Sequence, residues 1–322
     1  MSTPAAANGD AVAVLFPGQG SQSVGMGKAL YDALPAARLR FEEASDLLQK
    51  DFARLCFDSP DAELVRTDNA QPAMTLVSIT AYEALESAGI AAAAVAGHSV
   101  GEYAALYAAG VLSFPDTMRL VHARGTAMRD AAERHPGGMV AVFGLDAVRL
   151  TEICAEIGNG DVEVANHNTP TQVVLTGRSE AVRSVAQAAK SRGAKLVVPL
   201  KVSGPWHSRF MTDAQPALRN VLAGCAIGAP RVPVIANVTA APYSADPERI
   251  RQILVDQIVS PVLWAQSMAA LVSSGYRTYV EAGPGRVLAG LMKDIARDVS
   301  VFSLQSTDVL ATIRAAGAPR PQ

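Results

Sequence analysis

The residues best suited to chemistry are those at 97–101, which read GHSVG and match the pattern G-x-S-x-G. This pattern is typical of a nucleophile elbow, a sharp strand-to-helix turn that exposes a serine hydroxyl at the top of a sheet. The flanking glycines let the backbone approach where a Cβ atom would clash. Ser99 is therefore a candidate nucleophile, and the alternative is a tight structural turn with no chemical role.

A serine nucleophile needs a base, and a histidine is the usual one. The chain has five histidines: His98, His122, His135, His167 and His207. His207 lies in the turn-rich segment 203–208, SGPWHS, and loops at strand ends often carry catalytic residues. Taken alone, it is also consistent with an ordinary surface histidine. No Asp or Glu between Ser99 and His207 stands out as the acid of a catalytic triad.

Two further features have open interpretations. The glycine-rich loop at 17–25 follows the first strand, but it has Ser23 where a dinucleotide fingerprint needs glycine and Met26 where a P-loop needs lysine. Its backbone and Gln19 could help to hold an oxyanion, although a simple turn is the plainer interpretation.

Arg124 lies in an apolar helical segment. It is either solvated, with its aliphatic stem packed on the core, or buried as a residue that binds an anion. The pattern alone favours the solvated arginine.

Composition limits the class of protein. The 322 residues are 49% hydrophobic and 18% charged, which excludes a disordered chain, and the net charge of −2 points to neither nucleic acid nor membrane as a partner. Cys56, Cys154 and Cys225 follow no metal-ligand spacing and are expected to be reduced. The first ten residues lack the positive flank of a signal peptide, and no 18-residue stretch is apolar and uncharged. We expect a soluble, cytoplasmic protein with loose ends.

The elements that must position these residues follow an α/β order. Strands are expected at 11–16, 91–96, 232–238 and 278–281, and helices at 28–34, 36–50, 71–87, 102–109, 115–133, 248–257 and 261–274, with a last helix from residue 287. Residues 139–200 instead alternate as βαββαβ, the order of a ferredoxin-like unit. We predict a large α/β-hydrolase-like domain with a parallel sheet at 1–134 and 201–322, and an inserted small ferredoxin-like domain at 135–200.

Six motifs occur in one order along the chain. They are FPGQGSQ at 16–22, GHSVGE at 97–102, HARGTAM around Arg124, ANHNTPTQVVLTG at 165–177, VSGPWHSRFM at 202–211 and EAGPG at 281–285. Together they resemble the malonyl-CoA:acyl-carrier-protein transacylase family, which includes enzymes of fatty-acid synthesis and the acyltransferases of polyketide synthases. The resemblance extends from about residue 12 to residue 304.

The resemblance implies a role for each matching residue. Ser99 would be the acylated nucleophile and His207 the general base, oriented by the backbone carbonyl of Gln257 instead of a carboxylate. The backbone N–H groups of Gln19 and Val100 would form the oxyanion hole.

The resemblance also implies the substrate contacts. Arg124 would bind the free carboxylate of the malonyl group, and His98 and Trp206 would complete the substrate site. In this family an aromatic residue before the base histidine accompanies selectivity for malonyl over methylmalonyl groups, and Trp206 has that position.

The activity implied is ping-pong transfer of a malonyl group from malonyl-CoA to the phosphopantetheine thiol of an acyl carrier protein. It needs no metal or other cofactor, and a monomer is expected. The alternatives are a serine thioesterase or esterase, the malonyl-loading subunit of a malonate decarboxylase, and a non-catalytic subunit that binds carrier protein. Because carrier proteins are generally acidic, docking would need a local basic patch. Candidates are Lys190, Arg192, Lys195, Lys201, Arg209 and Arg286.

Overall fold

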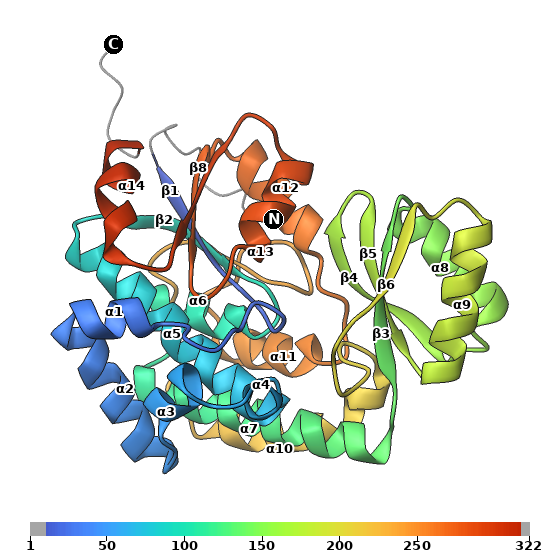
Figure 1. Cartoon of the computed structure of the whole chain (residues 1–322), viewed down its shortest axis with the longest axis horizontal. Helices are drawn as coiled ribbons and strands as arrows, with labels where there is room; N and C mark the ends of the chain where they lie inside the picture. Colours follow the sequence, from blue (N-terminus) through green and yellow to red (C-terminus); the bar gives the residue numbers. More distant parts are fainter. Residues whose placement is uncertain (1–10, 317–322) are drawn as a thin grey trace.

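The main body of the protein is built on a five-stranded parallel sheet, seen in a computed structural model that describes residues 11–316 (Figure 1). Its strands run in the order β7-β2-β1-β8-β9. Their bounds are β1 Val12–Phe16, β2 Ala92–Gly97, β7 Val234–Ile235, β8 Thr278–Ala282 and β9 Ser300–Leu304. All five residues of β1 are buried, as expected for the central strand of a parallel sheet covered on both faces.

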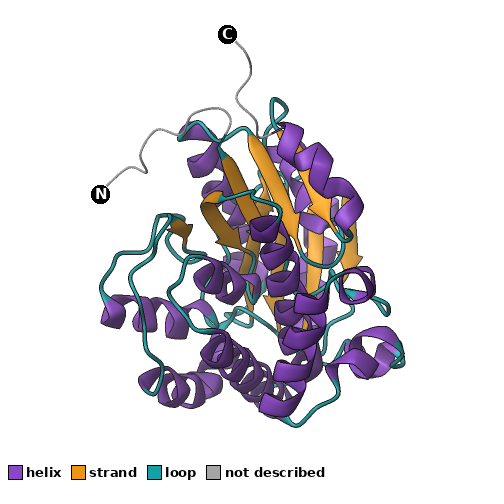
Figure 2. Ribbon diagram, turned by 90° about the vertical axis from the view of Figure 1, so that its left-hand side faces the viewer, coloured by secondary structure: helices purple, strands orange, loops and turns teal. Residues whose placement is uncertain are grey.

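Helices cover both faces of this sheet (Figure 2). Because side chains alternate along a strand, Val14 and Phe16 of β1 pack into one hydrophobic cluster and Leu15 packs into another. The first cluster includes α5 Thr67–Ser87, α6 Gly101–Ala108 and α7 Phe114–Arg134. The second includes α12 Trp264–Ser273 and α13 Val287–Ile295. The sheet therefore separates two hydrophobic cores, one on each face.

A second sheet is antiparallel and lies beside the first (Figure 1). It is formed by β3 Gly138–Phe143, β4 Val162–Thr169, β5 Gln172–Gly177 and β6 Leu196–Pro199, in the order β4-β5-β3-β6. Two helices, α8 Ala147–Ile157 and α9 Ser179–Ser191, pack on it and enclose a third hydrophobic cluster. The predicted fold class, a parallel α/β body with a small ferredoxin-like βαββαβ unit, is confirmed.

The remaining helices belong to the main body, and most of them pack against other helices, chiefly α5 and α7. They are α1 Lys28–Ala33, α2 Pro35–Leu48, α3 Phe52–Phe57, α4 Asp61–Leu64, α10 Gln215–Ala223, α11 Pro247–Gln257 and α14 Leu310–Ala316, with 3₁₀ turns at Arg209–Ala214 and Thr307–Val309. In the described part of the chain, no helix is long and apolar enough to cross a membrane. The expectations for the tails, at 1–10 and 317–322, lie outside these residues.

The prediction for one strand was wrong, and several elements were not predicted. Residues 232–238 were expected to be a strand, but β7 has only two residues; it pairs with β2, and Ile235 also bridges to Pro242. The chain leaves the sheet after Ile235 because the Asn237 backbone N–H and side chain bond to groups beneath the elbow instead of to a strand. The missed elements are β9, the short helices α3, α4 and α14, and the helical segment 209–223.

Candidate active site

The GHSVG turn is a strained elbow between β2 and α6. Ser99 has φ of 52°, a left-handed conformation that is rare for a residue with a side chain. A Cβ atom on Gly97 would lie 2.0 Å from the Gly101 carbonyl, and one on Gly101 would lie 2.2 Å from the Phe16 carbonyl oxygen. Only glycine fits at both positions. The elbow also packs against the end of β1, which brings the loop at 17–22 next to Ser99.

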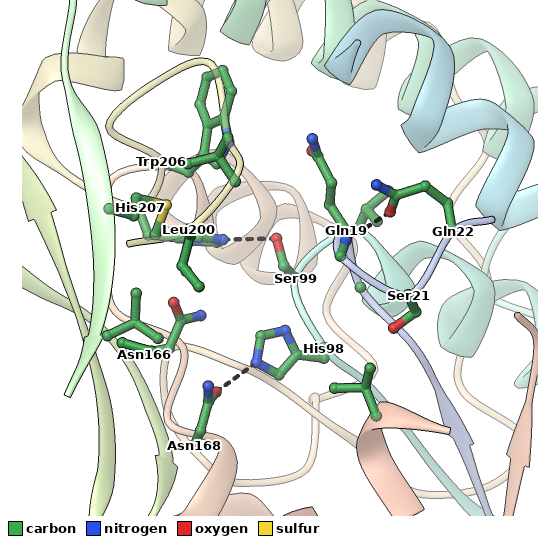
Figure 3. A pocket seen from close by; sticks show the side chains of 18 of the residues that line it. Gln19, Ser21, Gln22, His98, Ser99, Asn166, Asn168, Leu200, Trp206 and His207 are labelled. Carbon is green, nitrogen blue, oxygen red and sulfur yellow. Dashed lines mark hydrogen bonds between the residues drawn. The ribbon is translucent and has the colours of Figure 1, made fainter. Parts of the chain in front are cut away.

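His207 reaches the serine from the loop after β6 (Figure 3). Its Nε2 lies 2.7 Å from Ser99 Oγ, and its Nδ1 lies 3.0 Å from the Gln257 carbonyl oxygen and 3.1 Å from that of Ser260. Because carbonyl oxygens only accept, Nδ1 carries the proton and Nε2 is left to accept one from the serine. Burial, aided by Arg124, lowers the pKa of His207 to about 3, so the imidazole is neutral at pH 7.

Of the other four histidines, one lies at this site and three do not. His98 lines the same cavity, with Nε2 2.9 Å from Asn168 Oδ1, and points away from Ser99 (Figure 3). His122 lies on α7, His135 pairs with Asp213, and His167 contacts Gln266. The structure therefore brings one histidine, His207, to the serine hydroxyl.

Arg124 is buried and faces the nucleophile, so the solvated interpretation favoured by its local pattern was wrong. The side chain projects from α7 and is 1% exposed. Nη1 donates to Gln71 Oε1 at 2.7 Å, while Nη2 donates to Gln257 Oε1 at 2.8 Å and to Ser99 Oγ at 3.1 Å. All three acceptors are uncharged, and no carboxylate within residues 11–316 forms an ion pair with this guanidinium. A buried cation without a counter-ion is costly, which is typical of a site built to receive an anion.

Two backbone N–H groups lie beside the serine. Those of Gln19 and Val100 have no acceptor among the residues that the structure describes. The side chain of Gln19 is held in place, since its Oε1 accepts from the Thr67 hydroxyl at 2.9 Å and its Nε2 donates to the Val65 carbonyl at 3.4 Å. A fixed loop with free N–H groups next to a nucleophile can bind a developing oxyanion.

These groups open into a cavity of about 440 Å³ between the large and small sheets. One wall comes from the loop after β1 and from α13, and the other from β4 and the segment that follows β6. Trp206 is 5% exposed and lines the cavity beside the base, packed so closely against Gly204 that a Cβ atom there would lie 2.6 Å from the indole. Asn166 and Asn168 of β4 face the elbow across the cavity (Figure 3). No group of three or more metal-ligating side chains occurs in the described chain.

Three polar residues of the site were not predicted from the sequence. Asn237 accepts from the Ser99 N–H at 2.7 Å and donates to the Gly97 carbonyl at 2.6 Å, which ties both sides of the elbow together. Gln71 holds Arg124, and Glu102 contacts Gln257. Their only sequence signal is position: Asn237 lies within the predicted strand 232–238, Gln71 begins the predicted helix 71–87, and Glu102 directly follows the GHSVG turn.

A serine on a strand-to-helix elbow, hydrogen-bonded to a neutral histidine, defines the class of serine enzymes that work through an acyl-enzyme. Comparison with known proteins is more specific: the chain belongs to the acyl transferase domain family, whose model matches residues 14–314. The family resemblance predicted from the six motifs is confirmed.

Several relatives in this family are similar over almost their whole length. The chain is 41% identical to the malonyl CoA-acyl carrier protein transacylase of Bacillus subtilis (strain 168), over 93% of this chain and 95% of that protein. Its fold is similar to the corresponding transacylase of Coxiella burnetii, with a TM-score of 0.93 at 34% identity, covering 98% and 99% of the two chains. It is also similar to a malonyl-transacylase solved in complex with a type II polyketide synthase acyl-carrier protein, with a TM-score of 0.91 at 39% identity, covering 94% and 98% of the two chains.

Proposed function

We propose that this protein transfers a malonyl group from malonyl-CoA to Ser99, and from there to the phosphopantetheine thiol of an acyl carrier protein. The observation that carries the proposal is Arg124, a buried cation 3.1 Å from the serine hydroxyl whose partners are all neutral. The relatives named malonyl CoA-acyl carrier protein transacylase support the same substrates.

In the first half-reaction, Ser99 Oγ attacks the thioester carbon of malonyl-CoA as its proton passes to His207 Nε2. The negative charge that develops on the thioester oxygen is received by the N–H groups of Gln19 and Val100. The C–S bond then breaks, and the CoA thiolate takes the proton from His207. This leaves a neutral base and a malonyl ester on Ser99.

In the second half-reaction, the carrier thiol gives its proton to His207 and attacks the ester carbon. The C–O bond to Ser99 breaks, and the proton returns from His207 to Ser99 Oγ. Both half-reactions use the same two groups, and the carbonyl of Gln257 holds the imidazole ring throughout. We propose that no metal or bound cofactor takes part, because a thioester is already an activated acyl group.

Arg124 distinguishes this proposal from a simple thioesterase or esterase. Its burial disfavours the charged form and lowers its pKa, so an incoming carboxylate would supply the counter-ion that the free protein lacks. A bidentate arginine–carboxylate pair would fix the distal end of the malonyl group while its thioester lies at Ser99. His98 and Trp206 would form the walls around the bound acyl chain.

The setting of the reaction is also part of the proposal. We propose a cytoplasmic monomer with a catalytic domain at 1–134 and 201–322, a small domain at 135–200, and substrates bound between them. The three buried free cysteines agree with a reducing compartment. Fatty-acid and polyketide synthesis both use this transfer, and assays with carrier proteins of each kind would decide between them.

The test is intact-mass measurement after incubation with malonyl-CoA and no acceptor. The wild-type protein should gain one malonyl group, Ser99→Ala should gain none, and His207→Ala should gain it slowly, since loss of a positioned base costs about 10²–10⁴-fold. Addition of holo carrier protein should then discharge the ester to the carrier thiol. Malonylation of Ser99→Ala would contradict the nucleophile assignment, and free malonate without an adduct or a loaded carrier would indicate a thioesterase.

A further inference from the structure

A fourth polar side chain lies beneath the serine, histidine and arginine, and the mechanism above gives it no role. Glu102, on the first turn of α6, is fully buried. Its Oε1 accepts from the Asn237 backbone N–H at 2.9 Å and from the Tyr243 hydroxyl at 2.8 Å, and its Oε2 accepts from Gln257 Nε2. A buried charge is tolerated only when it is well hydrogen-bonded, and here three donors surround one carboxylate in the protein interior.

Gln257 connects this carboxylate to the site. Its side-chain Nε2 donates to Glu102 and, at 2.9 Å, to the Ser99 carbonyl oxygen. Its Oε1 accepts from Arg124 Nη2, and its backbone carbonyl orients His207. One residue therefore contacts the nucleophile's backbone, the base and the cation at the same time.

The orientation of the Gln257 amide follows from the chemistry of its neighbours. A carboxylate and a carbonyl oxygen only accept, so the NH₂ group must face Glu102 and Ser99 and the oxygen must face Arg124. The reversed amide would place oxygen against two acceptors and NH₂ against a cation. Glu102 is thus one of the two acceptors that turn the NH₂ group of this amide away from the arginine.

We propose that Glu102 is a positioning residue for substrate selection: its carboxylate orients the Gln257 amide, which holds Arg124 ready for the free carboxylate of the acyl group. The inference rests on the proposed malonyl transfer and adds a residue that neither touches the substrate nor takes a proton from it. The amide also separates the two charges. Glu102 therefore offsets the buried cation without occupying the N–H groups that the substrate needs.

The expected effect is a loss of discrimination more than a loss of chemistry. In Glu102→Gln the new amide oxygen is retained by the fixed Asn237 N–H, so the new NH₂ group faces Gln257 Nε2. Two opposed donors force the Gln257 amide to turn and present its NH₂ group to Arg124. We expect kcat/KM for malonyl-CoA to fall about 10–100-fold, as for loss of a charged hydrogen-bond network, and kcat/KM for acetyl-CoA to fall far less.

The pH dependence gives a readout that a purely structural role would not change. Burial raises the pKa of Glu102 to about 7, while its donors and Arg124 oppose that rise. Below this pH the carboxyl gains a proton, its O–H opposes Gln257 Nε2, and the malonyl preference should fall. The groups facing Glu102 remain in one state from pH 5.5 to 8.5: burial raises the pKa of Tyr103 and of Tyr243 above 10, His207 is neutral, and Arg124 is charged.

The experiment measures the ratio of kcat/KM for malonyl-CoA to that for acetyl-CoA from pH 5.5 to 8.5. The variants are Glu102→Gln, Tyr243→Phe and the control Glu281→Gln, which removes a buried carboxylate that bonds only to α13 and Ser303. We expect a rising profile in the wild type and in Glu281→Gln, and a low, flat one in Glu102→Gln. In Tyr243→Phe the midpoint should move to higher pH, because the carboxylate loses a donor that stabilises its charged form.

A wild-type ratio and profile in Glu102→Gln would overturn the inference. If that variant does not fold, Tyr243→Phe decides, because an unmoved midpoint there would also overturn it. Failure of the wild type to take a malonyl group would remove the proposed function itself, and it would be visible before any variant is compared.

Discussion

At the scale of single residues, the site combines a neutral base with a buried cation that forms no ion pair within residues 11–316. Burial lowers the pKa of His207, so the imidazole is neutral at pH 7. Arg124 is also buried, and its hydrogen-bond partners are all neutral. In the proposed reaction, the first condition would prepare the serine for attack, and the second would select an acyl group that carries its own charge. We expect selection at the other end of the acyl group to depend on shape.

The shape selection should depend on Trp206. The indole is buried beside the base and fixed against Gly204, so an α-methyl group would have to fit next to a side chain that has little room to move. We expect malonyl-CoA to be preferred over methylmalonyl-CoA by about 10–200-fold, the usual range for exclusion of one methyl group, and Trp206→Ser to reduce that preference. Values of kcat/KM for the two thioesters test this, and equal wild-type values would contradict it.

Arg124→Ala is the companion variant, because it changes charge selection and leaves the indole in place. It should lose malonyl transfer and gain relative activity on acetyl-CoA. Continued preference for malonyl-CoA in this variant would contradict the role of the arginine.

At the scale of elements, Glu281 ties β8 to the start of α13. Its carboxylate accepts from the backbone N–H groups of Leu288 at 3.0 Å and Ala289 at 2.9 Å, and burial raises its pKa from the ordinary 4.5 to about 7. A raised carboxyl pKa means that the folded state holds its proton more tightly than the unfolded state does. The contribution of Glu281 to the free energy of unfolding is therefore complete below pH 4.5. It is lost as the pH rises through 7, and the loss for this group alone is about 3 kcal/mol.

Replacing Glu281 by Gln should remove that pH dependence. The Tm difference between variant and wild type should be most unfavourable to the variant near pH 5 and smaller near pH 8. Thermal unfolding at the two values checks this, with Glu248→Gln as the control, since the Glu248 side chain is 82% exposed. The same Tm difference at both pH values would mean that Glu281 is charged in the folded protein throughout.

Local sequence predicted the elements better than it predicted the site. Buried strands and the βαββαβ order follow from patterns within a few residues, and so does the GHSVG elbow. The role of Arg124 depends on Gln71 and Gln257, which are 53 and 133 residues away, and nothing near Arg124 signals that it is buried. Residues 232–238 have a strand-like pattern, although Asn237 hydrogen-bonds to the elbow and is not part of the sheet. Contacts between distant segments are not encoded in local periodicity.

At the scale of the whole molecule, the cavity lies between the two sheets, and the carrier protein must reach it from outside. Of the six basic residues proposed for docking, Lys201 lines the cavity and Arg286 adjoins Val287, which also lines it. Arg192 and Arg209 already pair with Glu156 and Asp161. Lys190 and Lys195 are exposed but do not line the cavity. We therefore expect docking to depend mainly on Lys201 and Arg286.

Reversing both charges, in Lys201→Glu with Arg286→Glu, should raise KM for the carrier protein more than it slows formation of the malonyl-enzyme. Like charges would then face an acidic partner, and the effect should weaken with added salt. Lys190→Glu is the matched control, because Lys190 is exposed on α9 and does not line the cavity. An equal loss in both half-reactions would mean that the two residues support the structure or CoA binding instead.

The base of this site is oriented by the main chain, through the carbonyls of Gln257 and Ser260. A carboxylate in that place could be deleted by one codon change, whereas a carbonyl is present whatever side chain the position carries. Substitutions at position 260 should therefore be nearly silent in a mutational scan, although that residue contacts the base. The path of the backbone after α11 sets the orientation of His207. Only a change that moves this backbone, such as an insertion or a deletion, can remove it.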